Sequence, residues 1–218
     1  MTPRIKICCM SSRQEMRHAV RAGADALGFV SSMPSGPGVL KEDHIADLLR
    51  HVPPTVTSVL LTSQQTPDAI IQQHRRCPAA VLQLVDHVAP HHYATLRKAL
   101  PGVHLMQVVH VTGPSSVEAA AALDGRVDAV LLDSGCPNAD VKELGGTGRT
   151  HNWTWSRSIV NRLETPVFLA GGLNASNVGD ALRTVQPFGV DLCSGVRTAG
   201  LLDPEKLRSF VRAVSRGN

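Results

Sequence analysis

The stretch PVFLAGGLNASNVGDALRTVQPFGVDLCSGV, residues 166–196, contains a complete strand–helix–strand unit. It begins with a short apolar run, passes through two glycines into a segment with hydrophobic residues every three to four positions, and ends with a second apolar run. The two runs are typical of buried strands, and the spacing between them is typical of an amphipathic helix. Strands that are apolar on both faces favour a parallel sheet whose strands are joined by helical crossovers.

The same unit recurs along the whole chain. Apolar runs predict strands at 4–9, 24–30, 56–62, 79–85, 103–111, 127–134, 166–172 and 189–195. Helical spacing predicts helices at 12–23, 41–52, 66–77, 90–100, 115–125, 152–163, 176–185 and 203–214. Capping groups such as Thr66, Asn174 or Ser176, and Asp203 mark helix starts. Eight such units fit a closed barrel. We therefore predict an α/β fold, a single (β/α)8 TIM barrel domain over residues 1–218, with an open doubly wound sheet as the alternative.

Composition argues against a membrane protein, a nucleic-acid-binding protein and a disulfide- or metal-stabilised protein. No apolar stretch approaches the ~20 residues that span a bilayer, so we expect a cytoplasmic protein without membrane contact. The net charge is +4, but the basic residues are dispersed and aromatic residues make up only 3%, which argues against nucleic-acid binding. Five cysteines without a C-x-x-C pair, and ten histidines without metal-ligand spacing, predict neither a disulfide framework nor a metal site. We expect no cofactor.

Two loops have the character of an anion site. In a barrel the active site lies at the carboxyl ends of the strands, and phosphate often binds the loops after strands seven and eight. Gly171 and Gly172 end the seventh predicted strand, and Ser194 and Gly195 end the eighth. These glycines could merely form tight turns, but two such loops side by side predict a phosphate site, because glycine lets backbone N–H groups approach an anion closely.

Two further strand ends carry groups that can transfer protons. Asp133 ends the sixth predicted strand, where it could cap a turn or act as an acid whose pKa is raised by partial burial. Cys8 ends the first, where it could be a small buried hydrophobic residue or a thiol whose pKa is lowered beside Lys6. Alternation along the strand places Lys6 and Cys8 on the barrel interior and Cys9 on the side of the helices, as packing.

The motifs KIC, AGADALGFV, LLDS, GGTGRTHNW, PVFLAGGLN and GVDLCSGV occur together and in this order. In this combination the chain resembles the phosphoribosylanthranilate isomerase family of tryptophan biosynthesis, an aromatic amino-acid pathway. The resemblance implies an Amadori rearrangement of an aminoaldose phosphate to an aminoketose phosphate, acting on a small phosphorylated sugar. It implies Cys8 as general base and Asp133 as general acid. It implies a phosphate site at Gly171, Gly172, Asn174, Ser194, Gly195 and Val196.

The chain departs from the family where the aromatic acid is expected to bind. Pro37 stands where the family has an arginine for the anthranilate carboxylate, and Val85 stands where it has a histidine. Lys6, Pro37, Arg149 and Arg197 are possible substrate contacts, and Arg149, Arg197 or His110 could replace the lost arginine.

These departures leave two alternatives open. One is an isomerase-like barrel that acts on a different phosphorylated sugar. The other is a non-catalytic protein that binds a phosphorylated metabolite. The oligomeric state is not predicted.

Overall fold

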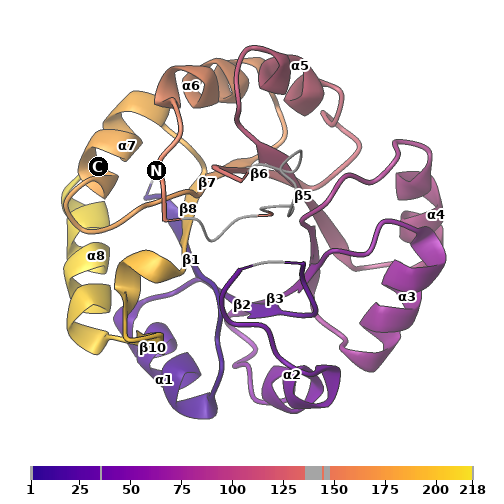
Figure 1. Cartoon of the computed structure of the whole chain (residues 1–218), viewed down its shortest axis with the longest axis horizontal. Helices are drawn as coiled ribbons and strands as arrows, with labels where there is room; N and C mark the ends of the chain where they lie inside the picture. Colours follow the sequence, from indigo (N-terminus) through magenta and orange to yellow (C-terminus); the bar gives the residue numbers. More distant parts are fainter. Residues whose placement is uncertain (1, 35, 136–143, 145–147, 218) are drawn as a thin grey trace.

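A computed structural model describes residues 2–34, 36–135, 144 and 148–217. Part of the GGTGRTHNW motif, residues 145–147, and Cys136 lie outside the described residues. Eight parallel strands form a closed barrel in sequence order, with β1 paired to both β2 and β8 (Figure 1). The predicted (β/α)8 barrel is therefore confirmed, and the open sheet is excluded.

The strands are β1 (Arg4–Ile7), β2 (Ala26–Val30), β3 (Thr57–Thr62), β4 (Val81–Leu84), β5 (His104–His110), β6 (Ala129–Asp133), β7 (Val167–Leu169) and β8 (Gly189–Leu192). The helices are α1 (Arg13–Ala22), α2 (Glu42–Leu49), α3 (Pro67–Arg76), α4 (His92–Ala99), α5 (Ser115–Ala121), α6 (Trp153–Arg162), α7 (Val178–Val185) and α8 (Pro204–Arg216). Every predicted strand and helix is present. No helix among the described residues has the length and apolar character needed to cross a membrane.

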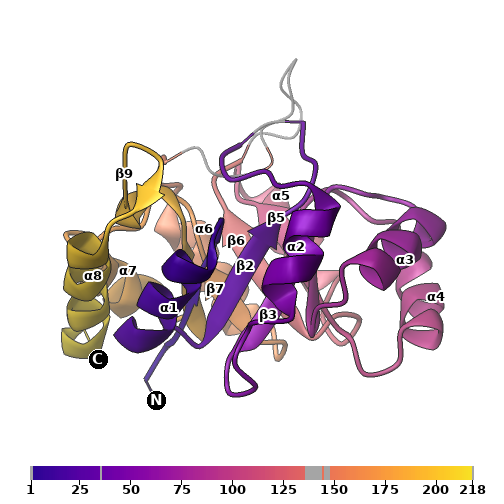
Figure 2. The same ribbon diagram turned by 90° about the horizontal axis from the view of Figure 1, so that it is seen from below.

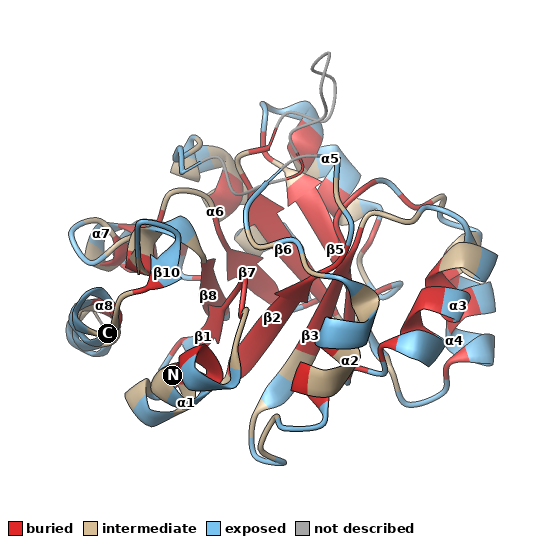
Figure 3. Cartoon of the chain, turned by 60° about the horizontal axis from the view of Figure 1, so that its bottom comes forward, coloured by how far each residue is buried: buried red, intermediate tan, exposed pale blue. Residues whose placement is uncertain are grey.

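The apolar side chains form two layers. One fills the space between the strands and the surrounding helices, and a smaller one lies inside the barrel. Figure 3 shows buried strands surrounded by helices whose outer faces are exposed. This arrangement explains why the strands are apolar on both faces, since each strand contacts both layers.

Capping follows the sequence at some helix starts and not at others. The Asp203 carboxylate accepts hydrogen bonds from the N–H groups of Glu205 and Lys206, as predicted. Helix α7, however, begins at Val178 rather than at Ser176. The Asn174 side chain instead accepts from the Ser176 backbone N–H at 2.9 Å, which forms a local turn before the helix.

The chain after β8 contains structure that the sequence periods do not predict. A 3-10 helix, η1 (Ser194–Val196), leads into a small antiparallel hairpin of β9 (Arg197–Thr198) and β10 (Leu201–Leu202). Figure 2 shows β9 at the same rim of the barrel as the loop after β2. Both segments lie where the strands end, so they contribute to the wall of any site there.

Candidate active site

A cavity opens at the carboxyl ends of the barrel strands and holds about 700 Å³ of space, counting its mouth. Seven of the eight strands or the residues directly after them line it, through Cys8, Val30, Leu61, Gln83, Asp133, Ala170 and Asp191. This position is the one that the barrel fold predicts for chemistry.

Three buried groups meet at the floor of the cavity. The Lys6 ammonium donates to Cys8 Sγ at 2.6 Å and to Asp191 Oδ1 at 2.9 Å, and the Cys8 thiol donates to Asp191 Oδ2 at 3.4 Å. Strand alternation puts Lys6 and Cys8 on one face, and the register of β1 against β8 pairs Lys6 with Asp191. Gly28 on β2 leaves room for the thiol, because a Cβ there would lie 2.7 Å from Cys8 Sγ.

The protonation states of this group follow from burial and charge. Burial disfavours the charged amine, but Asp191 and Cys8 outweigh it and hold the pKa of Lys6 above its ordinary value. Burial and the Asp191 carboxylate raise the pKa of the Cys8 thiol well above its ordinary value, against the opposing effect of Lys6. Cys8 is therefore a thiol held between an ammonium and a carboxylate.

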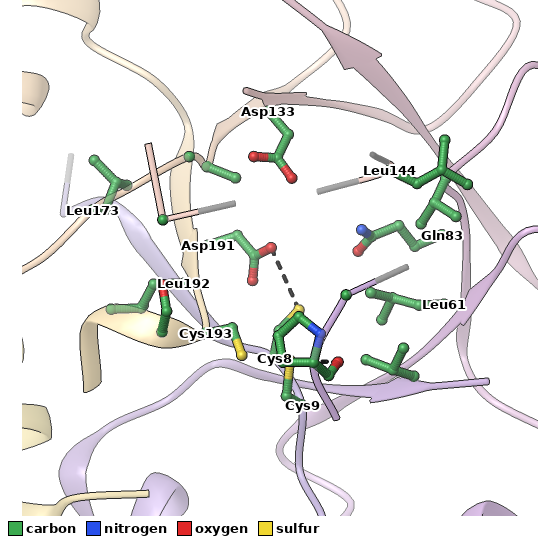
Figure 4. A pocket seen from close by; sticks show the side chains of 18 of the residues that line it. Cys8, Cys9, Leu61, Gln83, Asp133, Leu144, Leu173, Asp191, Leu192 and Cys193 are labelled. Carbon is green, nitrogen blue, oxygen red and sulfur yellow. Dashed lines mark hydrogen bonds between the residues drawn. The ribbon is translucent and has the colours of Figure 1, made fainter. Parts of the chain in front are cut away.

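Asp133 lies across the cavity from Cys8 (Figure 4). It is the last residue of β6, is buried, and accepts a hydrogen bond from the Ser134 N–H at 2.7 Å. Burial raises the pKa of the Asp133 carboxyl, and this effect outweighs the lowering effects of the Ser134 hydrogen bond and His110. The carboxyl thus keeps its proton to a higher pH than an exposed aspartate does, as a general acid requires.

The two glycine loops lie against each other at one wall of the cavity. Gly171 and Gly172 after β7, and Ser194 after β8, line the cavity. A Cβ on Gly195 would lie 2.0 Å from the Leu173 carbonyl oxygen, so a side chain at position 195 would push the loops apart. Gly172 has a φ of +61°, and a Cβ added at this position would lie 2.7 Å from the backbone carbonyl carbon of Arg149. Glycine is therefore required at both positions.

Comparison with known proteins identifies the family. The family model described as N-(5'-phosphoribosyl)anthranilate (PRA) isomerase matches residues 5–213. The chain belongs to this family. The isomerase of Methanothrix thermoacetophila is 35% identical over 211 residues, which cover 97% of each chain. That of Halorubrum lacusprofundi is 36% identical and covers 98% of this chain and 97% of its own. The crystal structure of the Thermotoga maritima enzyme matches with a TM-score of 0.84 at 25% identity, over 98% of this chain and 99% of that one.

Membership of the phosphoribosylanthranilate isomerase family confirms the resemblance seen in the motifs. The residues expected at the phosphate do not all lie in the cavity wall. Of the residues expected at the phosphate, Gly171, Gly172 and Ser194 line the cavity. The others lie behind them: Asn174 in the turn before α7, Gly195 against Leu173, and Val196 fully buried.

The position of Cys9 corrects the expectation for this residue. Strand β1 ends at Ile7, so its alternation does not extend to Cys9, whose φ of 65° lies in the left-handed region. Cys9 lines the cavity with Cys8 and Cys193, and its thiol lies 3.7 Å from the Pro37 carbonyl oxygen. Glycine adopts this conformation without strain, so Cys9 carries a side chain where the backbone geometry favours glycine.

Of the four residues predicted as possible substrate contacts, one lines the cavity and three lie outside its wall. Pro37 lines the cavity, whereas Lys6 lies beneath Cys8, fully buried. Arg197 is not part of the cavity wall; it pairs with Glu15 at 2.9 Å, and both side chains are buried. Arg149 is exposed and contributes its backbone next to Gly172. The geometry therefore gives no support to Arg197 as a replacement for the family's arginine.

Sequence reasoning missed two residues of the cavity, Asp191 and Gln83. The pairing of β1 with β8 places the Asp191 carboxylate beside Lys6 and Cys8, a contact that the sequence of the eighth strand alone does not predict. The signal for Gln83 was a polar residue within the otherwise apolar run AAVLQLV. Among the described residues, no group of three or more His, Cys, Asp and Glu side chains is placed to hold a metal ion.

Proposed function

We propose that the protein isomerises N-(5'-phosphoribosyl)anthranilate by an Amadori rearrangement, with Asp133 as general acid and Cys8 as general base. One observation carries the proposal: a buried carboxyl and a buried thiol face each other across one cavity whose wall contains the two glycine loops. Family membership supports the same reaction, which belongs to tryptophan biosynthesis.

Asp133 performs the first proton transfer. Opening the ribose ring requires a proton on the ring oxygen, and the raised pKa of Asp133 keeps a proton available for it. Ring opening gives a protonated Schiff base between C1 and the anthranilate nitrogen. The positive charge of this intermediate makes the C2 proton acidic and increases the attraction of the site for a nearby anion.

Cys8 performs the second transfer. Removal of the C2 proton needs the thiolate, which burial and the Asp191 carboxylate disfavour. The cationic Schiff base reverses this preference because an opposite charge nearby lowers a thiol pKa. Asp191, which already accepts the Cys8 hydrogen bond, is placed to take the thiol proton, and Lys6 stabilises the resulting negative charge. Tautomerisation of the enolamine then gives the aminoketose phosphate.

The glycine loops supply backbone contacts that anchor the phosphate. Gly171, Gly172 and Ser194 present backbone to the cavity on the side of β7 and β8. A phosphate held there fixes one end of the sugar, so that C2 and the ring oxygen lie between the thiol and the carboxyl. Holding the sugar at its phosphate also keeps the open-chain intermediate within the site.

A second candidate function is the isomerisation of a different phosphorylated sugar. The described residues that line the cavity include no Lys, Arg or His side chain, and the wall away from the glycine loops is apolar, with Met33, Pro37, Leu61 and Val85. This wall can pack an aromatic ring but offers no cation to the anthranilate carboxylate. A neutral aglycone fits it equally well.

The test follows the fluorescence of freshly prepared phosphoribosylanthranilate after addition of the purified protein. We expect fluorescence to decay with the wild type and the decay rate to fall by about 10²- to 10⁴-fold with Asp133→Asn, the usual contribution of a general acid. Absence of decay with a folded wild-type protein that binds phosphorylated sugars would favour the second candidate. Absence of both decay and proton exchange at C2 of any bound sugar would leave a non-catalytic binding protein.

A further inference from the structure

Gln83 is a buried polar side chain of the cavity that the proposed proton transfers do not use. It lies on β4, is only 3% exposed, and lines the cavity. In Figure 4 its amide points into the space bounded by Cys8, Asp133 and Asp191. Among the described residues that line the cavity, Gln83 Oε1 is the buried side-chain atom that lacks a hydrogen-bond partner.

A neighbouring buried glutamine, Gln107, has hydrogen-bond partners within the protein for both atoms of its amide. Gln107 on β5 is equally buried, but its Nε2 donates to the carbonyl oxygens of Leu84, Asp86 and Val108, and its Oε1 accepts from the Tyr93 hydroxyl at 2.9 Å. Leaving a buried amide oxygen without a donor is unfavourable, and an apolar residue of the same size would avoid that cost. The contrast indicates that the amide of Gln83 has its partner in the ligand.

The identity of that partner follows from the atom and its position. An amide oxygen accepts hydrogen bonds, so it needs a donor, and neither a phosphate dianion nor the anthranilate carboxylate provides one. Hydroxyl groups do. The acid and base must flank the reacting sugar carbons, which places the ribose, rather than the aromatic ring, in the space between Cys8, Asp133 and Gln83.

We propose that Gln83 binds the 2- and 3-hydroxyl groups of the ribose moiety, Oε1 accepting from one and Nε2 donating to the other. This inference rests on the proposed function, whose sugar it describes. The adjacent acceptor and donor of an amide match two adjacent hydroxyls on the same side of a chain. Gln83 thereby orients C2 toward Cys8 and makes the site selective for sugars that carry both hydroxyls.

The test uses two stable ligands made by reductive amination of anthranilate, one with ribose 5-phosphate and one with 3-deoxyribose 5-phosphate. The products differ in a single hydroxyl. Calorimetry gives the Kd of each for the wild type, for Gln83→Met, which keeps the side-chain length, and for the matched control Gln107→Met. Gln83→Leu replaces Gln83→Met if that variant does not fold.

For the wild type we expect the ribose-derived ligand to bind about tenfold more tightly than the 3-deoxy ligand, the value of one net hydrogen bond. For Gln83→Met the ratio falls to within about twofold, while Gln107→Met keeps the wild-type ratio even if its melting temperature drops. An unchanged ratio in Gln83→Met overturns the proposal, as does a wild type that does not discriminate between the ligands or binds neither.

The outcomes separate this inference from the proposed function. Decay of phosphoribosylanthranilate fluorescence together with an unchanged ratio refutes the role of Gln83 and leaves the isomerase. Discrimination that depends on Gln83, without fluorescence decay, refutes the isomerase and leaves a site for a phosphorylated ribose derivative.

Discussion

The protonation state of each buried residue at the floor of the cavity depends on its neighbours. Lys6, Cys8 and Asp191 form a buried group in which one cation faces a thiol and a carboxylate. A buried cation without an anion is costly, and both Asp191 and the Cys8 sulfur stabilise the Lys6 ammonium. Yet Asp191 also opposes ionisation of Cys8. The proposed base is therefore held as a thiol, and the positive charge of the proposed Schiff-base intermediate favours its thiolate form.

This balance predicts the effect of Asp191→Asn on thiol reactivity. Removing the carboxylate takes away a cause of the raised Cys8 pKa and leaves the Lys6 ammonium beside the sulfur. A lower pKa raises the thiolate fraction, so we expect Cys8 to react with iodoacetamide several-fold faster at neutral pH. Peptide mass spectrometry follows each cysteine.

Cys77, buried at the end of α3 and away from Asp191, is the internal control for this experiment. An equal rise in the labelling of Cys77 would show that the variant had loosened as a whole. Slower labelling of Cys8 in the variant would contradict the proposed arrangement of charges.

The residues of the site were predictable where strand alternation applies and not where it ends. Lys6 and Cys8 share the interior face as alternation requires. Cys9 lies two residues beyond Ile7, in a backbone conformation that alternation does not describe. Arg197 illustrates a different limit, because its partner Glu15 is 182 residues away in the sequence, and nothing local marks the pair.

At the level of elements, the closeness of the β7 and β8 loops is a condition for the proposed phosphate site. The sequence predicts both loops from their glycines, but their mutual packing depends on tertiary structure. Gly195 lies against the Leu173 carbonyl, so one loop fixes the position of the other. The hairpin of β9 and β10, which follows directly, is too short to leave a periodic pattern in the sequence.

Gly195→Ala tests this packing. The added methyl group would overlap the Leu173 carbonyl oxygen, and a clash of this kind typically costs about 1–3 kcal/mol. We expect the KM for the phosphorylated substrate to rise about 10- to 100-fold, with a smaller change in kcat. Gly113→Ala is the matched control, because nothing lies within 4 Å of a Cβ at that position. Equal KM values in the two variants would mean that the loops do not form the phosphate site.

At the level of the whole molecule, the barrel closes by joining the two ends of the chain. Strand β1 pairs with β8, and Glu15 on α1 reaches the C-terminal segment. The Glu15 carboxylate accepts hydrogen bonds from Arg197, from the Leu202 N–H at 2.9 Å and from the Ser11 N–H at 3.0 Å. Burial alone raises the pKa of Glu15, but these bonds outweigh it and hold the pKa below its ordinary value.

The lowered pKa predicts a pH-dependent contribution to stability. Because the folded protein favours ionised Glu15, the contribution is complete above the unfolded pKa of about 4.3 and is lost as the pH falls through the lower folded value. We expect Glu15→Gln to lower the free energy of unfolding by about 3 kcal/mol at pH 7, since it leaves Arg197 without its anion. The difference from the wild type should shrink on acidification below about pH 4.

Urea unfolding at several pH values measures this contribution, and Glu205→Gln is the control. Glu205 is exposed and, in the part of the chain that the structure describes, forms an ion pair with Arg208 of its own helix, so its loss should cost less than about 1 kcal/mol. A Glu15→Gln difference that stayed constant across the pH range would rule out linkage to this carboxylate.

The central claim is that Cys8 removes the C2 proton, and Cys8→Ala tests it most directly. Both turnover of phosphoribosylanthranilate and the Kd of the ribose-derived reduced ligand are measured for the variant and the wild type. We expect turnover to fall by about 10²- to 10⁴-fold while the Kd changes by less than about twofold, because the glycine loops and Gln83 remain. Turnover close to that of the wild type would remove Cys8 from the mechanism.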